Sequence, residues 1–146
     1  MAGTKTATRK IHRSSERIPM HARLRLRTED GTPTAPLARC TNVSLGGIRA
    51  IAAQGLSPGT RIQVDLQLPN GRHFHTQGRI AWLLTTLRPS LLSTPTGRDD
   101  DAVFGITFED ASPQDLLPIA RLFAVREAER RRARRIRRLH TLRIHA

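Results

Sequence analysis

The sequence is short of aromatic residues and of cysteine, and both shortages limit what the chain can be. Its 146 residues include one Trp, four Phe and no Tyr, so a core must be built from Val, Ile, Leu and Ala. A chain of this length forms one domain and can bury such a core, which suits a compact barrel or sandwich. Cys40 is the only cysteine, which excludes an intramolecular disulfide and fits a reducing compartment. Cys40 lies in an apolar stretch, and we expect it to be a small buried residue.

Long apolar runs and catalytic patterns are also missing. No stretch approaches the roughly 20 apolar residues of a spanning helix, and residues 1–17 lack the apolar core of a signal peptide. We therefore expect a cytoplasmic protein without a transmembrane segment. There is no Ser/His/Asp order, paired-carboxylate setting or phosphate-binding P-loop, so we do not expect an enzyme. The run Asp99–Asp101 lies in a stretch with Gly and Pro and predicts an exposed loop over residues 87–101.

The positive charge, by contrast, is abundant and uneven. Residues 1–27 hold eight basic and one acidic side chains, residues 28–125 hold eight and nine, and residues 126–146 hold nine and two. These segments contribute +7, −1 and +7 to the net charge of +13. A near-neutral body with two basic ends predicts that the ends meet anions, such as a phosphorylated ligand, nucleic acid, acidic lipid or an acidic protein surface.

The order of patterns predicts a flexible arm, a set of strands and a helix. Residues 1–18 are basic and without periodicity, and we expect them to form an arm that becomes ordered on binding. Strict alternation then begins at Met20, with Met20, Ala22, Leu24 and Leu26 on one face. Turn signals such as Asn70-Gly71 separate further short apolar stretches. Together they predict six or seven strands, within residues 20–27, 37–43, 48–52, 60–68, 74–84 and 104–108.

The C-terminal part of the sequence is typical of a helix with a basic extension. Ser112 is suited to cap a helix with Pro113 in its first turn, and Leu116, Ile119, Ala120 and Phe123 recur at helical spacing. Residues 125–146 form an Arg-rich tail, helical or disordered, with a weak apolar face. A solvated segment, a protein partner, nucleic acid and an anionic membrane each fit this tail.

Two short motifs, about 25 residues apart, indicate a ligand. Arg13-Ser-Ser-Glu-Arg17 lies in the arm, and Asn42-Val-Ser44-Leu-Gly46-Gly47 follows an apolar strand. Arginine offers a planar fork that fits phosphate and the O6/N7 edge of guanine. In this order and spacing the motifs resemble the RxxxR and (D/N)xSxxG motifs of PilZ domains, which are bacterial receptors for cyclic di-GMP. The resemblance extends over roughly residues 13–124.

The resemblance implies a mainly β fold, namely an antiparallel PilZ-like barrel over residues 19–124 with a closing C-terminal α-helix. It also implies that Arg13 and Arg17 grip phosphate and guanine, and that Asn42 and Ser44 contact the ligand from the barrel surface. Gly46 and Gly47 would let the backbone approach it, and would permit backbone geometry that other residues resist. No cofactor is implied beyond this ligand.

Several residues have open assignments. Arg9 and Arg13 also read as RxxxR, although Ile18-Pro19 after Arg17 favours the later pair. His12 stands where the family often has another Arg, which leaves one or two bound ligands open. Trp82 alternates with Ile80 and Leu84, so the core is its default place and a wall of the ligand site is the alternative. His73 and His75 share a strand face, but no third metal ligand is evident and we expect no metal site.

Two classes of function follow from these observations. One is a receptor or adaptor that binds cyclic di-GMP and alters an effector protein supplied in trans, with motility, pili, polysaccharide or biofilm as the output. The other is a PilZ-like protein that does not bind the nucleotide. It would act through protein or nucleic-acid contacts of the Arg-rich tail.

Overall fold

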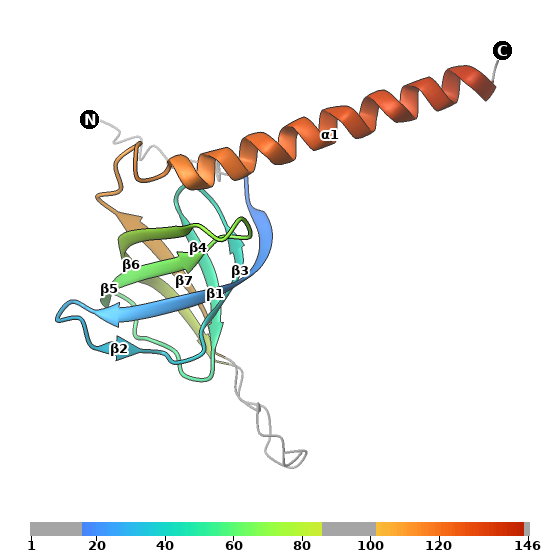
Figure 1. Ribbon diagram of the computed structural model, residues 1–146. Coiled ribbons are helices and arrows are strands. Elements are labelled where there is room, and N and C mark those ends of the chain that lie inside the picture. The colour runs from blue at the N-terminus through green and yellow to red at the C-terminus, as the bar shows by residue number, and fades with distance from the viewer. Residues whose placement is uncertain (1–15, 86–101, 145–146) are drawn as a thin grey trace, which may run out of the picture.

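A computed structural model of the protein describes residues 16–85 and 102–144. It consists of seven strands followed by one long helix (Figure 1). The strands are β1 (Ile18–Thr28), β2 (Pro33–Thr34), β3 (Arg39–Val43), β4 (Gly47–Ala52), β5 (Arg61–Gln67), β6 (His73–Thr85) and β7 (Ala102–Glu109), and the helix is α1 (Leu117–Ile144). The predicted residues Arg9, His12 and Arg13, and the loop at 87–101, lie outside the described ranges.

The strands close into an antiparallel barrel. Hydrogen-bonded neighbours follow the order β2-β1-β3-β4-β7-β6-β5, and an additional pairing of β1 with β5 joins the two ends. Because β1 has 11 residues, its first part pairs with β3 and its second part with β5. β2 pairs only with the end of β1 and stays outside the six-stranded barrel. The predicted fold, a six- to seven-stranded barrel with a C-terminal helix, is confirmed.

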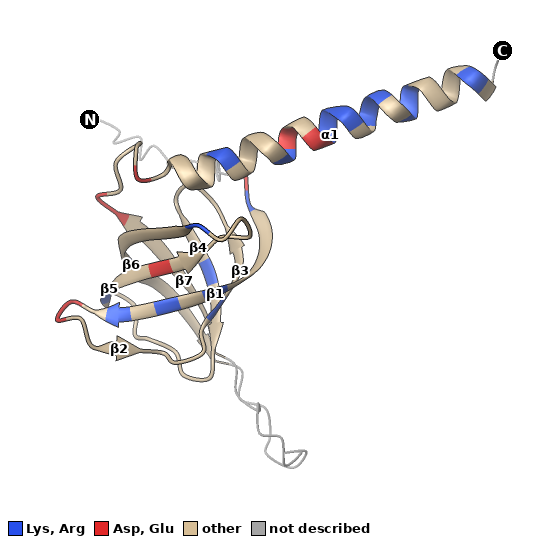
Figure 2. Ribbon diagram, in the orientation of Figure 1, with Lys and Arg blue, Asp and Glu red and all other residues tan. Residues whose placement is uncertain are grey.

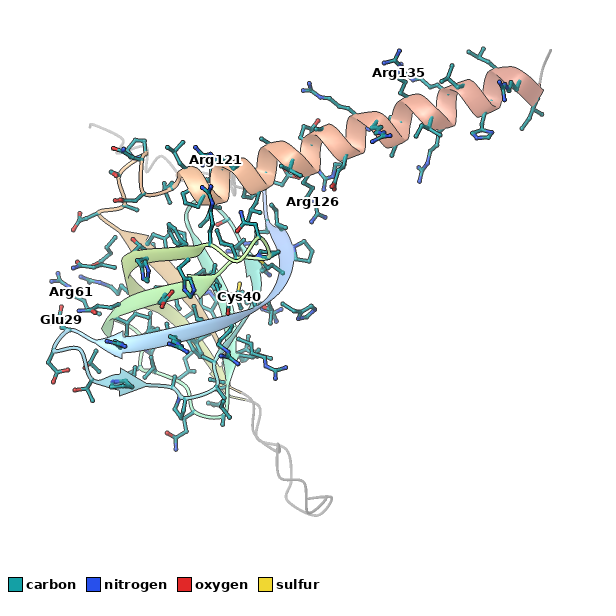
Figure 3. The ribbon with its side chains drawn as sticks, viewed as in Figure 1. Glu29, Cys40, Arg61, Arg121, Arg126 and Arg135 are labelled. Carbon is teal, nitrogen blue, oxygen red and sulfur yellow. The ribbon has the colours of Figure 1, made fainter. Side chains whose placement is uncertain are left out.

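The core fills the barrel with the aliphatic residues that the composition requires. Leu24 and Leu26 of β1 are buried with Ile18 and Met20, as the alternation predicts. Phe74 and Phe108 meet edge to face, with ring centroids 5.2 Å apart. Cys40 is fully buried inside the barrel (Figure 3), as predicted. The helix α1 covers one end of the barrel, and its Ile119 is fully buried in the same core cluster.

The helix begins four residues later than the Ser112 cap and Pro113 predict. Ser112 and Asp115 do exchange two capping hydrogen bonds: each backbone N–H donates to the other side chain, at 3.0 and 3.1 Å. Hydrogen bonds from the backbone N–H and then the side chain of Ser112 lower the pKa of the Asp115 carboxyl. These capping bonds hold only a turn. A helix that began at Pro113 would have Pro118 in its interior, where proline lacks the N–H and its ring would clash with a preceding carbonyl. Proline is tolerated in a first turn, so α1 starts at Leu117.

From its first turns on the barrel, α1 continues into solvent. Figure 1 shows it leaving the barrel beyond β1, without a break at residue 125. Its 28 residues make it about 42 Å long. Within residues 16–85 and 102–144, no helix has both the length and the apolar character needed to cross a membrane.

Candidate functional site

The two sequence motifs meet in space. Arg17, at the end of the arm, donates from Nη1 to Oδ1 of Asn42 at 2.9 Å, although 25 residues separate them. The pairing of Ile18 with Val43 and of Pro19 with Asn42 brings them together, because the arm leads straight into β1. The structure therefore joins Arg17 and Asn42 on the outer surface of the barrel.

A bulge in β3 turns Asn42 outward. The pairing of β3 with β4 shifts between Cys40 and Asn42, which leaves Thr41 as the extra residue. Cys40 and Val43 face the core, whereas Asn42 lies opposite Arg49 on the outer face. Without this bulge the alternation of β3 would not place both Cys40 and Val43 in the core.

Ser44 takes a different place from the one expected. It is 2% exposed, and its hydroxyl lies within the turn between β3 and β4. The backbone N–H groups of Gly46 and Gly47 donate to Ser44 Oγ at 3.2 and 3.1 Å. The hydroxyl lies 3.3 Å from the Gly47 carbonyl and donates to it. Ser44 is thus a turn-forming residue in this structure and does not present its hydroxyl on the surface.

Gly46 and Gly47 are adjacent but meet different constraints. Neither has a positive φ, so the prediction that they provide unusual backbone geometry is wrong. A Cβ at Gly47 would lie 2.1 Å from the carbonyl oxygen of Ile106 in β7. A Cβ at Gly46 would meet nothing closer than Ser44 Oγ at 3.9 Å. Close strand packing therefore requires the glycine at 47, whereas Gly46 lies exposed at the surface.

Trp82 lies on the outside of the barrel, and its expected default place in the core is wrong. A bulge between Ile80 and Trp82 shifts the alternation of β6, so Leu83 packs on the core and Trp82 is 39% exposed. The indole covers Gly105 of β7: a Cβ there would lie 2.1 Å from Nε1 of Trp82. Gly105 leaves the space in which the indole rests on the sheet.

Asn42, Arg49, Gly105 and Trp82 form one row across β3, β4, β7 and β6. Each is the direct antiparallel partner of the next, and directly opposed residues share a face. Three strand spacings separate Asn42 from Trp82, or about 14 Å. The row therefore presents an amide, a guanidinium and an aromatic face on one surface, with Arg17 at its Asn42 end. We call these four side chains, Arg17, Asn42, Arg49 and Trp82, the outer row.

Arg49 was missed at the sequence level. Its position two residues after Gly47 in an alternating strand indicates an outward side chain, which is what the structure has. The sequence could not show that a bulge in β3 places Asn42 opposite it.

The arm also contacts the helix. The Glu16 carboxylate, next to Arg17, lies 2.5 Å from Arg130 of α1 and forms an ion pair with it. Both side chains are about half exposed. Glu16 lies within the arm motif, so this pair connects the candidate site to the base of the projecting helix.

His73 and His75 have a third group beside them, contrary to the sequence-level view. Asp65 of β5 lies opposite His75, and its Oδ1 is 2.9 Å from His73 Nδ1 and 3.6 Å from His75 Nδ1. All three ligand atoms lie within 4.8 Å of one another. Arg25 is the other cross-strand partner of Asp65. Arg25 and Arg23 line a small hollow together with Asp65 and His73. These two positive charges disfavour a bound cation, so we interpret the cluster as cross-strand charge pairing.

A larger hollow of about 620 Å³ lies away from the outer row. It is lined by residues of both charge signs, including Arg25, Arg27, Glu109 and Asp115. No residue of either motif contributes to it. We place the candidate site at the outer row, where the two motifs meet.

The sequence and the fold of the chain are similar to those of known proteins. The family model of the PilZ domain matches residues 11–124, which include both motifs. The chain belongs to the PilZ domain family. No curated protein matches the chain significantly.

Solved PilZ structures share its fold. The PilZ domain of YcgR with c-di-GMP, from Escherichia coli, superposes with a TM-score of 0.60 at 18% identity, over 84% of this chain and 97% of that one. YcgR in complex with c-di-GMP, also from E. coli, gives 0.61 at 17%, over 86% and 50%. The MrkH–c-di-GMP complex of K. pneumonia gives 0.60 at 17%, over 82% and 55%. The chain thus spans about half the length of YcgR and MrkH.

Proposed function

We propose that this PilZ domain protein is a receptor for cyclic di-GMP. The observation that carries the proposal is the Arg17–Asn42 hydrogen bond, which joins the arm motif to the turn motif. The structures of YcgR and MrkH with c-di-GMP support it, since both share this fold. The protein would act as a receptor rather than as an enzyme.

The chemistry of the outer row fits a cyclic dinucleotide. Its two phosphodiesters are anionic, and its guanines offer O6 and N7 as acceptors. Arg17 would exchange the neutral Asn42 acceptor for phosphate or guanine oxygens, gaining charge-assisted bidentate bonds. Asn42 would then have both a carbonyl and an amide group available for a guanine edge. Arg13, four residues before Arg17, would supply a second fork from the arm.

Arg49 and Trp82 would extend the contact along the row. The Arg49 guanidinium is exposed beside Asn42 and can meet a phosphate. The exposed part of the Trp82 indole offers an apolar ring on which a guanine can stack, a contact of about 1–3 kcal/mol per base in single-strand binders. Ser44 would act through the turn it holds, and Gly46 would leave the backbone open to the ligand.

The output would be a change in a partner supplied in trans. Binding would alter the surface that the barrel offers to another protein. Motility, pilus assembly, polysaccharide synthesis and biofilm formation are the candidate outputs.

Isothermal titration calorimetry with cyclic di-GMP at moderate salt tests the proposal, with GTP and GMP as controls for general attraction to basic groups. We expect saturable binding at micromolar affinity or tighter, with one or two ligands per chain. Arg17→Ala and Asn42→Ala should each weaken it at least ten-fold. Arg72→Ala, on the hairpin between β5 and β6, is the matched control and should not.

Equal, weak binding of all three nucleotides would reject the receptor and leave the interaction protein that acts without the nucleotide. Trp82 gives an independent measurement, because it is the sole tryptophan of the chain. Its fluorescence should change on addition of cyclic di-GMP and stay unchanged with GMP.

A further inference from the structure

The outer half of α1, residues 128–144, stands away from the barrel. Every residue from Ala128 to Ile144 is exposed, and the helix contributes only Ile119 to the fully buried core. In the part of the chain that the structure describes, Arg130 makes the one ion pair between this segment and the residues before α1, with Glu16. Figure 1 shows the segment projecting alone into solvent. Packing on its own barrel therefore does not account for it.

Beyond Glu129 its charge is of one sign. Residues 130–144 hold eight Arg and no acidic residue, and Figure 2 shows the basic residues along this part of the helix. Arginines four apart, such as Arg130 and Arg134 or Arg134 and Arg138, repel each other on a helix and weaken it. Along α1 one ion pair at this spacing is formed, between Glu127 and Arg131. A polyanion beside the segment would relieve this repulsion.

The distribution around the axis indicates which polyanion fits. At about 100° per residue, the eight arginines spread over roughly 240° of the helix circumference. A flat anionic surface can meet only one side of a helix. The major groove of a B-form DNA duplex admits a helix and has phosphates on both walls. Figure 3 shows Arg135 pointing away from the barrel into open space.

The apolar residues argue against a membrane. Helices that lie in a membrane interface have Trp, Phe or Leu on a well-separated face. Here no aromatic residue follows Phe123. Ile136 and Leu139 are about half exposed, and Arg132 and Arg143 fall on their side of the helix. A second copy of the segment would bring eight further positive charges against the first eight.

We propose that residues 128–144 of α1 bind double-stranded nucleic acid, chiefly through arginine contacts to the phosphates. The planar fork of arginine suits these bidentate contacts better than lysine does. Binding of this kind is independent of the sequence and falls steeply with salt. The inference rests on the helix alone and stands whether or not the barrel binds cyclic di-GMP.

Fluorescence anisotropy with a labelled DNA duplex of mixed sequence tests it, at salt concentrations from 50 to 200 mM. We expect micromolar affinity at the lowest salt and a linear fall of log affinity with log salt, with a slope of about −0.9 per phosphate contacted. The triple variant Arg134→Gln, Arg135→Gln, Arg138→Gln should bind at least ten-fold more weakly and show a slope smaller by about three.

The charge-matched control is the triple variant Arg61→Gln, Arg72→Gln, Arg79→Gln on the barrel. Its affinity for the duplex should fall by less than two-fold. Circular dichroism checks that the helix persists in both variants. Equal losses in the two variants would overturn the proposal, because general attraction by net charge would then explain the binding.

Three further arms separate other partners. Vesicles with anionic phosphatidylserine, and polyglutamate as an acidic peptide, should bind more weakly than the duplex. Ile136→Asn with Leu139→Asn should leave duplex binding unchanged. Tighter binding to vesicles or polyglutamate would overturn the proposal in favour of that partner. Sedimentation that shows a dimer lost in the Ile136→Asn, Leu139→Asn variant would overturn it in favour of self-association.

Discussion

Gly46 and Gly47 stand side by side in the turn motif, yet replacing them should change stability by very different amounts. Gly47→Ala would force β4 and β7 apart, since its Cβ would overlap the Ile106 carbonyl. We expect it to lower the free energy of unfolding by about 2 kcal/mol or more. Gly46→Ala meets open space and should change it by less than about 0.5 kcal/mol. Urea unfolding measures both, and equal losses would show that the two positions share one constraint.

Cys40 should make the protein lose stability at alkaline pH. Burial raises the pKa of its thiol to about 12 from the usual 9.0. The unfolded chain ionises above pH 9 while the folded chain keeps its proton, so stability is intact below pH 9 and falls between pH 9 and about 12. Because one thiol ionises only in the unfolded chain, the free energy of unfolding should fall by about 1.4 kcal/mol between pH 8 and pH 10.

Urea unfolding at pH 8 and pH 10 measures this loss, and Cys40→Ala is the control whose stability should stay level. The chain has no Tyr and only two lysines, Lys5 and Lys10, so few other groups titrate in this range. A pH dependence that survives in Cys40→Ala would contradict the prediction.

Single residues could be predicted from sequence where the pattern is local. The motifs singled out Arg17 and Asn42, which the structure brings into contact, and the alternation of apolar residues placed Leu24 and Leu26 in the core. Trp82 was misplaced because one extra residue in β6 reverses the faces that follow, and a bulge leaves no mark in apolar spacing. The close approach of Ile106 to Gly47 is a contact between distant strands, and for this reason the sequence suggested a different role for that glycine.

At the scale of elements, the contact between arm and helix sets a test. Glu16 places a carboxylate next to Arg17, where the phosphates of cyclic di-GMP would lie, and Arg130 partly neutralises it. Glu16→Gln removes this negative charge, so we expect about three-fold tighter binding of cyclic di-GMP by calorimetry. Stability should fall by less than about 1 kcal/mol, because the ion pair is at the surface. Weaker binding would mean that Glu16 helps to hold the ligand.

Glu127→Gln is the matched control. Glu127 pairs with Arg131 on the same helix, and its loss should leave nucleotide affinity unchanged.

The strands were easier to predict from sequence than the start of the helix. Each strand has its own alternation and turn residues, whereas Ser112 and Pro113 supply a complete start signal that Pro118 cancels five residues later. Leu37 shows a similar limit: it was assigned to a strand, but it is 90% exposed, and its φ of 60° places it in the turn before β3.

For the whole molecule, barrel and projecting helix should be separable. A chain that ends after Glu127 loses the exposed side chains of residues 128–144, and with them two surface ion pairs among the described contacts, Arg130–Glu16 and Arg131–Glu127. We expect its free energy of unfolding in urea to lie within about 1 kcal/mol of the full chain. Ile119→Ala, by comparison, removes a fully buried side chain where the helix meets the core and should cost about 2–4 kcal/mol. A large loss on truncation would show that residues 128–146 support the barrel.

The closed barrel could be predicted as a class from strand number and length, and the resemblance to PilZ domains implied an antiparallel barrel with a closing helix. The pairing of β1 with both β3 and β5 is a global property of closure, which no local pattern specifies. The length of the basic tail was visible in the sequence. Its course as a continuous helix was left open there, because its arginines repel one another and it has no apolar face that requires a partner.

Because α1 is anchored near one end, a tilt of the helix would move its far residues more than its near ones. Measured along the axis from the buried Ile119, Arg130 lies at about 16 Å and Ile144 at about 37 Å. A tilt of 10° about Ile119 would move Arg130 by about 3 Å and the far tip by more than 6 Å. A shift of the arm by roughly the length of one hydrogen bond, transmitted through Glu16, therefore becomes more than twice as large at the arginines farthest from the barrel.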